Sequence, residues 1–286
     1  MKLIDLVEEF MKNYAERRLR PSTVRGYRVN LYRHVLPWFE DAPLELLDVA
    51  ALDELTDELH GKGLSSRSIV YVHATLRKML NYAVRRGILN VNPYNQFDMP
   101  RVNRYHYRVL LEEDMLRMLD CVRGTPLEIP VTLSLCYGLR RGECLGVMPV
   151  FDLDCSKNVL HIQRTRSVEN KQPAITPCKT EDSNRFILLR PEHTFLLANA
   201  PAHNGFACEL SPTQLEHKFK LLLRAHDFPK IRFHDLRHSY ATLMLSKGVN
   251  PKIVSSVLGH SGVGITLDIY SHPDVAMQRK CLDVFL

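Results

Sequence analysis

Two arginines, two histidines, a lysine and a tyrosine in the second half of the chain have the types and spacing to act together on a phosphate ester. The string HDLRH at residues 234–238 puts His234 and Arg237 three residues apart, on one face of a predicted helix, so both can address one ligand. An arginine and a histidine beside apolar residues are costly to bury without a charged partner. The alternative interpretation is that the string only begins a helix and that its basic face binds no ligand.

Another arginine lies at the start of a predicted helix, in the string YGLRRGE at residues 137–143. Gly138 lets the chain turn sharply, so that the helix begins at Arg140 and the guanidinium lies near the positive helix end, where an anion is stabilised. Taken alone, this string is also typical of an ordinary solvated surface.

A lysine is predicted at the tip of a hairpin between two strand-like segments, in the string TPCKTED at residues 176–182. Such a lysine is usually solvated, but over a phosphate the ammonium of Lys179 could donate a proton to a leaving alkoxide. Lys171 is the alternative, because the sequence does not fix the register of the hairpin.

The remaining histidine and the tyrosine follow a helix end. Asn250 caps and Pro251 starts a helix that the string LGH at residues 258–260 closes, which leaves His260 after its C-terminus. Tyr270 follows ten residues later between apolar residues, a setting that, taken alone, is typical of core packing.

Together these residues can carry out one reaction. Two arginines can hold the non-bridging oxygens of a phosphodiester in bidentate fashion and stabilise the charge of the transition state. A tyrosine hydroxyl can then attack the phosphorus, which forms a phosphotyrosyl ester and releases a hydroxyl. This chemistry needs no metal and no cofactor, and none is expected.

The set and its order resemble the tyrosine recombinase or phage integrase family, whose pattern is Arg, Lys, His-x-x-Arg, His or Trp, then Tyr. The resemblance covers essentially the whole chain and implies a site-specific DNA recombinase that forms a 3′-phosphotyrosyl intermediate. It implies that Arg140 and Arg237 bind the scissile phosphate and that Lys179 is the acid for the 5′ oxygen. His234 would assist proton transfer, His260 would hydrogen-bond the phosphate, and Tyr270 would be the nucleophile. Glu143 would support the site from behind.

The resemblance also implies partners and an architecture. An all-α, SAM-like core-binding domain and a catalytic domain would clamp double-stranded DNA, and the apolar C-terminal segment would dock on a neighbouring protomer to build a homotetramer. Accessory DNA-bending or excision factors are further expected partners. The chain begins in the clamp domain, so a Xer-like recombinase and a mobile-element integrase without an arm-binding domain both fit.

The elements that must position these residues fall into two predicted domains. Residues 1–103 show helical periodicity, and the five basic residues predicted to contact DNA lie on two amphipathic helices: Arg25, Arg28, Arg67, Arg77 and Lys78. The first of these helices is expected to bury one stripe: Val24, Tyr27, Leu31, Val35 and Trp38. The alternative is that the basic residues only solubilise the helices.

Residues 104–286 form the predicted catalytic domain, which follows a polar linker. Helices are expected near residues 112–122 and 129–137, and short strands at 159–165 and 185–189. This order predicts an α+β fold that is mainly helical with a small antiparallel sheet.

Composition is consistent with this interpretation. The 286 residues carry a net charge of +6, which suits a polyanionic partner, although solvated basic faces are also common. No apolar run approaches the roughly 18 residues of a membrane helix, and no signal peptide is evident, so a cytoplasmic location is expected. The seven cysteines form no close C-x-x-C pair and are expected to be reduced thiols.

Two rival functions remain open at this point. A type IB topoisomerase uses the same chemistry as a monomer, and would relax supercoils without regard to DNA sequence. A DNA-binding regulator with an inactive site is the other rival, although a complete set of catalytic residue types argues against it.

Overall fold

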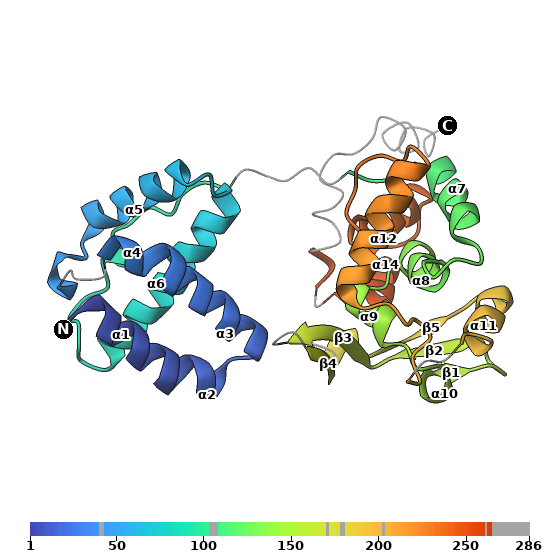
Figure 1. Ribbon diagram of the computed structural model, residues 1–286, viewed down its shortest axis with the longest axis horizontal. Coiled ribbons are helices and arrows are strands. Elements are labelled where there is room, and N and C mark those ends of the chain that lie inside the picture. The colour runs from blue at the N-terminus through green and yellow to red at the C-terminus, as the bar shows by residue number, and fades with distance from the viewer. Residues whose placement is uncertain are drawn as a thin grey trace, which may run out of the picture. The chain divides into compact units, whose positions relative to one another are not determined.

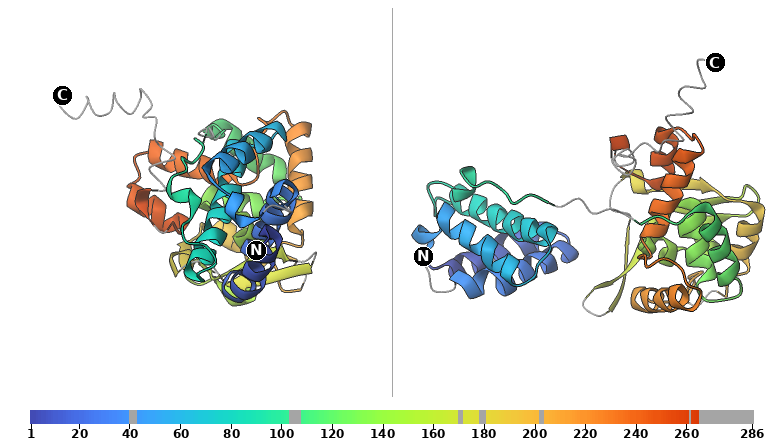
Figure 2. Two further views of the ribbon diagram at one scale, coloured as in Figure 1. Left: turned by 90° about the vertical axis from the view of Figure 1, so that its left-hand side faces the viewer. Right: turned by 90° about the horizontal axis from the view of Figure 1, so that it is seen from above.

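The computed structural model describes residues 1–39, 43–102, 108–169, 172–177, 181–201, 204–260 and 262–264. The chain divides into two compact units, Met1–Tyr105 and His106–Leu286, and each has a hydrophobic core of its own. The predicted boundary between residues 103 and 104 lies outside the described residues. Figures 1 and 2 show the chain from three sides.

The first unit is helical throughout its described part (Figure 1). Its α-helices are α1 (Leu3–Phe10), α2 (Glu16–Arg18), α3 (Pro21–Arg28), α4 (Leu36–Phe39), α5 (Val49–Gly61) and α6 (Ser66–Arg85). Its π-helical and 3₁₀ turns are η1 (Met11–Ala15), η2 (Val29–Val35), η3 (Leu44–Leu46) and η4 (Pro93–Asn95).

Helix α6 forms as its sequence predicts. The Ser65 side chain accepts a hydrogen bond from the Ser68 backbone N–H at 3.2 Å and caps the N-terminus. The apolar positions at spacings of three and four are all buried in the core: Ile69, Val72, Leu76, Met79 and Ala83. The basic residues of the helix are therefore left on its other faces.

The stripe predicted for the first basic helix is wrong at its end. Leu31 and Val35 are buried, but the Trp38 side chain is exposed, and Leu36 and Phe39 lie in the core instead. The cause is the π-helical turn η2, which is wider than an α-turn and rotates the following residues around the helix axis. A constant period of 3.6 residues therefore fails beyond η2.

The second unit combines helices with short strands. Its helices are α7 (Glu112–Val122), α8 (Glu128–Tyr137), α9 (Arg141–Gly146), α10 (Pro149–Asp152), α11 (Pro191–Ala198), α12 (Pro212–Ala225), α13 (Asp235–Ser246) and α14 (Pro251–Leu258). Its strands are β1 (Leu153–Asp154), β2 (Val159–Ile162), β3 (Arg164–Glu169), β4 (Gln172–Pro177) and β5 (Arg185–Leu188), with a 3₁₀ turn η5 (Glu181–Ser183). These elements confirm the predicted mainly helical α+β fold with small antiparallel sheets.

The strands form two small antiparallel sheets. One has the order β1-β2-β5, and the other is the β3–β4 hairpin. In Figure 1 the strands lie at one end of this unit, with α7, α8, α12 and α14 beyond them. Phe219 and Phe233 are fully buried in the core between these layers. This core holds the helix ends on which the predicted site residues lie.

Candidate phosphate-binding and catalytic site

A tight turn between α8 and α9 brings three predicted motifs together. Gly138 ends α8 with a left-handed backbone, φ 66°. A Cβ atom at Gly138 would lie 2.7 Å from the Tyr240 ring and 2.4 Å from the Leu258 side chain, so only glycine fits there. This close approach seats the start of α9 against α13 and α14, which carry the other two motifs.

Arg140 precedes α9 and is held by a buried carboxylate. Its backbone N–H donates to Glu143 Oε2 at 3.0 Å, and its guanidinium donates to Glu143 Oε1 at 2.7 Å. The Glu143 side chain is only 1% exposed, whereas that of Arg140 is 34% exposed. Arg140 therefore has one edge fixed from inside the protein and another that reaches the surface.

Arg237 lies beside Arg140 but deeper in the protein. One guanidinium nitrogen donates to the carbonyl of Gly138 at 2.7 Å, and the residue is 3% exposed. Its other terminal nitrogen, Nη2, is buried, and within the described ranges it has no hydrogen-bond acceptor. A buried donor without a partner is costly, so this nitrogen is available for an anion.

Burial, and then the positive charge of Arg140, lower the pKa of Arg237 to about 9. The two guanidinium groups therefore repel each other. Burial raises the pKa of Glu143, but the charges and hydrogen bonds of Arg185 and Arg140 more than offset this, and its net pKa is lowered. One buried carboxylate thus stands among three guanidinium groups, and an added anion would relieve the excess positive charge.

His234 and His238 lie at the N-terminal end of α13. Their rings are 5.0 Å apart in an edge-to-face arrangement. The start of the helix is fixed by Asp235, whose carboxylate accepts hydrogen bonds from the backbone and the guanidinium of Arg232 at 2.8 and 2.7 Å. Partial burial, and then the charges of Arg237 and Arg140, lower the pKa of His234. His234 is therefore close to the arginine pair.

His260 follows the C-terminus of α14, as predicted. Gly259 ends this helix with a φ of 65°, and its carbonyl accepts a hydrogen bond from Arg140 at 2.9 Å. Burial, and then the charges of Arg237 and Arg140, lower the pKa of His260 to about 4. The structure thus brings Arg140, Arg237, His234 and His260 to one place from three separated segments.

A cleft opens beside this cluster. Arg140 and His260 line it, together with Thr165, Arg166 and Thr213. Glu143 also lines the cleft, whereas the buried Arg237 is not among its lining residues. One side of the site is therefore open to a long substrate. This arrangement can hold a phosphodiester whose flanking groups extend along the surface.

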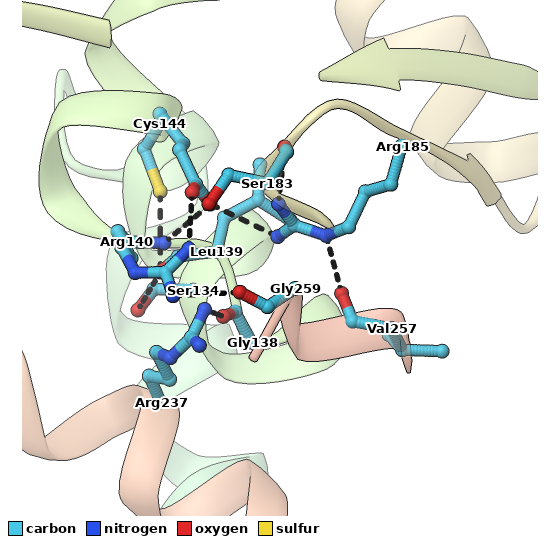
Figure 3. A network of polar contacts seen from close by, with 11 residues as sticks. Ser134, Gly138, Leu139, Arg140, Cys144, Ser183, Arg185, Arg237, Val257 and Gly259 are labelled. Carbon is cyan, nitrogen blue, oxygen red and sulfur yellow. Dashed lines mark hydrogen bonds and ion pairs between the residues drawn. The ribbon is translucent and has the colours of Figure 1, made fainter. Parts of the chain in front are cut away.

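Arg185 is a buried residue of this cluster that sequence reasoning missed. It donates to Glu143 Oε2 at 2.9 Å and to the carbonyl of Ser183 at 3.0 Å (Figure 3). Arginine at the first position of a short strand looks like an edge residue in sequence. The one available signal was the alternation with Ile187, which puts both side chains on the inward face.

Three predicted residues fall outside the described residues: Tyr270, Lys179 and the alternative Lys171. The strand pairing nonetheless corrects the predicted hairpin. Glu169 pairs with Gln172, so the β3–β4 ladder spans Arg164–Glu169 and Gln172–Pro177. In the sequence, Lys179 follows β4 and precedes η5, so it is not at the hairpin tip. The error arose because β3 and β4 are polar and lack the apolar alternation that marks half-buried strands.

The basic residues predicted to contact DNA in the first unit differ in their surroundings. Arg25, Arg67 and Arg77 are exposed. Arg28 forms a surface ion pair with Glu16 at 2.7 Å, and the ammonium of Lys78 lies 5.6 Å from the centre of the Tyr14 ring. An exposed ion pair contributes little and is easily exchanged for a phosphate contact. DNA contact by all five residues remains a prediction.

The cysteines and acidic residues offer little to a metal ion. Among the described residues, no three His, Cys, Asp or Glu side chains gather in a way that could hold one. The thiols of Cys121, Cys136, Cys144, Cys155 and Cys208 are free of disulfide bonds. No helix in the described part of the chain has the length and apolar composition to cross a membrane.

Two half-buried histidines predict that the protein loses stability in mild acid. Burial is the main cause that lowers the pKa of His238 and His260 to about 4, below the ordinary value near 6.5. The unfolded chain therefore binds protons more readily, and stability should be full above about pH 6.5 and fall toward pH 4. Glu143 and Asp235, whose pKa values are also lowered, act in the same direction.

We expect the thermal midpoint of the free protein to fall between pH 7 and pH 5 in a scanning calorimeter, and His260→Asn to reduce this fall. A midpoint that stays constant or rises would contradict the assignment of neutral, half-buried histidines.

The structure is that of a two-domain protein with paired arginines beside a cleft, and comparison with known proteins agrees with this fold. The family model "Phage integrase family" matches residues 108–277, and "Phage integrase SAM-like domain" matches residues 2–99. Tyrosine recombinase XerC of Psychromonas ingrahamii is 28% identical over 97% of this chain and 95% of its own length. The ICEBs1 integrase of Bacillus subtilis is 21% identical over 92% of this chain and 77% of its own length.

Solved structures share the fold. The Tn1549 transposon integrase, in complex with a circular intermediate DNA, superposes with a TM-score of 0.83 at 18% identity, covering 100% of both chains. A lambda integrase dimer bound to a COC′ core site gives a TM-score of 0.74 at 17% identity, covering 96% of this chain and 97% of that one. The chain belongs to the phage integrase family, the tyrosine-type recombinases, which are enzymes that break and rejoin DNA strands at specific sites.

Proposed function

We propose that this protein recombines specific DNA sites through a covalent 3′-phosphotyrosyl intermediate at Tyr270. The observation that carries the proposal is the juxtaposition of Arg140 and Arg237. Their mutual repulsion favours an anion between them, as does the Nη2 nitrogen of Arg237, which has no acceptor among the described residues. A phosphodiester has two non-bridging oxygens that suit two guanidinium groups.

The reaction proceeds in two reversible steps. The Tyr270 hydroxyl gives its proton to His234 as its oxygen attacks phosphorus. The bond from phosphorus to the 5′ oxygen breaks, and the 5′ hydroxyl leaves with a proton from Lys179. Lys171 is the alternative acid. A 5′ hydroxyl of a second strand then attacks the phosphotyrosine and releases the tyrosine.

The histidines and the carboxylate support these steps. His234 assists proton transfer, and His260 donates a hydrogen bond to the phosphate. Glu143 holds Arg140 from behind, which agrees with its two hydrogen bonds to that residue. The arginines stabilise charge that grows on the non-bridging oxygens in the transition state.

The proposed substrate is double-stranded DNA clamped by both domains, with Arg25, Arg28, Arg67, Arg77 and Lys78 on its phosphates. Relatives whose structures contain DNA support this partner. Accessory DNA-bending or excision factors belong to the same proposal, as does a cytoplasmic location. Integration, excision and dimer resolution are all compatible with the site.

Covalent trapping tests the function. On nicked suicide DNA that carries its target site, the protein should become linked to a 3′ end, and mass spectrometry of the adduct should identify Tyr270. A 5′ linkage, or attachment through another residue, would overturn the proposal. Relaxation of supercoiled plasmid without regard to sequence would favour a type IB topoisomerase instead.

We further propose that the protein acts as a tetramer on two DNA sites and that its C-terminal segment joins the protomers. A lambda integrase structure that is a tetramer bound to a Holliday junction supports this assembly. Deletion of residues from Pro273 onward should leave binding to a single site intact and abolish synapsis of two sites. Native gels with one and with two labelled duplexes distinguish single-site binding from synapsis. Tetramers that still form after the deletion would refute the proposal that the C-terminal segment joins the protomers.

A further inference from the structure

Strand β5 buries an arginine beside Ile187 and exposes its two other apolar residues. Phe186 and Leu188 are 71% and 73% exposed, whereas Arg185 is 8% exposed. An arginine side chain is rarely buried unless its charge and its hydrogen bonds are satisfied. The strand therefore buries a cation while large apolar side chains remain outside, which indicates that Arg185 has a specific task inside.

Its guanidinium joins three separate segments, as Figure 3 shows. Nε donates to the carbonyl of Val257 in the last turn of α14, and Nη1 donates to the carbonyl of Ser183 at 3.0 Å. Nη2 donates to Glu143 Oε2 at 2.9 Å. A planar fork can reach acceptors in three directions at once, and a lysine ammonium on a flexible stem cannot match this geometry.

The contact with Glu143 links Arg185 to Arg140. Glu143 Oε2 accepts hydrogen bonds from both the Arg140 backbone and Arg185, while Oε1 accepts from the Arg140 guanidinium. Arg185 thus fixes the carboxylate plane from the side opposite Arg140. Without it, the carboxylate could rotate and take the Arg140 guanidinium with it.

The contact with α14 links Arg185 to the histidine turn. A Cβ atom at Gly259 would lie 2.9 Å from Arg185 Nη1, so the two are in close contact. The carbonyl of the same glycine accepts the hydrogen bond from Arg140 at 2.9 Å. The Gly259 backbone is therefore held between the two arginines, and His260 is the next residue.

We propose that Arg185 is a positioning residue that holds Arg140 and the His260 turn in place for the scissile phosphate without touching the phosphate itself. The inference rests on the proposed function. Each guanidinium nitrogen of Arg185 is already engaged by Val257, Ser183 or Glu143, so its effect on the reaction passes through its neighbours.

The test uses two substitutions and two substrates with full-length protein. Arg185→Gln removes the charge, and Arg185→Lys keeps the charge but not the fork. Each variant is given nicked suicide DNA with an ordinary scissile phosphate, or with a methylphosphonate that carries no negative charge. An arginine that acts on the charge of the phosphate matters much less for the neutral substrate.

We expect Arg185→Gln to slow adduct formation on the phosphate by about 10- to 100-fold, as loss of a supporting contact does in other preorganised sites. The loss on the methylphosphonate should be at most a few-fold. Arg185→Lys should also slow adduct formation more on the phosphate than on the methylphosphonate, but by a smaller factor. If Arg185→Gln does not fold, Arg185→Lys alone is used to compare the two substrates. In an Arg140→Ala background, Arg185→Gln should add almost no further loss on the phosphate.

The matched control is Arg164→Gln. Arg164 donates to the buried carboxylate of Asp152 at 2.8 Å, so its loss also breaks a buried ion pair, but it does not contact the cluster. This variant should lose thermal stability and cleave both substrates like the wild type.

The inference is overturned if Arg185→Gln cleaves the phosphate normally, slows both substrates equally, or adds its full effect to Arg140→Ala. Absence of any adduct with the wild-type protein would instead remove the proposed function, so the two failures are distinguishable.

Discussion

Replacement of Tyr270 with phenylalanine will abolish the covalent adduct on nicked suicide DNA and leave DNA binding unchanged within about twofold. The substitution removes one oxygen atom, which is the proposed nucleophile, and keeps the aromatic ring. Affinity for DNA comes mainly from phosphate contacts over the whole interface, which this change does not touch. Denaturing gels measure the adduct, and gel shifts measure binding.

Another tyrosine, Tyr240, provides a matched control. Tyr240→Phe removes a hydroxyl from α13 in the core of the second unit, where the ring packs against Gly138. This variant should form the adduct at a rate close to that of the wild type. An adduct that persists in Tyr270→Phe would show that another residue attacks the phosphorus.

The parts of the site that sequence could predict are those fixed by local rules. The HDLRH string needs only the geometry of one helix to put His234 and Arg237 on one side, and α13 does begin after His234. Asn250, Pro251 and Gly259 signal the limits of α14 by capping preferences, and each lies where it was predicted. Local signals thus place the functional side chains on their elements.

Long-range pairing was not accessible to the same reasoning. The position of Arg185 depends on how β5 pairs with β2 and on Glu143, which is 42 residues away in the sequence. The polar β3–β4 hairpin has no apolar face to fix its register, so the predicted tip fell in the wrong loop. These contacts depend on how segments far apart in the sequence pair with each other, and local residue patterns do not determine that pairing.

The π-helical turn η2 is a third feature that the sequence analysis did not predict, because no residue type in the sequence marks a π-helical turn. Asn30 is buried within it and donates to the Thr75 hydroxyl at 2.8 Å. The partner lies on α6, 45 residues away. The shift that exposes Trp38 therefore follows from tertiary packing, which overrides the simple helical period.

Arg237→Gln should make the protein almost inactive and no less stable. Cleavage should slow by about 10² or more, because a donor to the charged non-bridging oxygens of the transition state is lost. The free protein should unfold at the same temperature or higher, because the substitution removes a buried cation whose pKa is lowered to about 9 by burial and then by the charge of Arg140.

Calorimetry without DNA and single-turnover cleavage test the two halves of this prediction on one sample. Arg164→Gln should give the opposite pattern, lower stability with normal cleavage, because Arg164 neutralises a buried carboxylate instead of facing another cation. Strong destabilisation of Arg237→Gln would show that the Arg237 guanidinium stabilises the fold because nearby negative charge compensates it. The excess positive charge on which the phosphate site depends would then be absent.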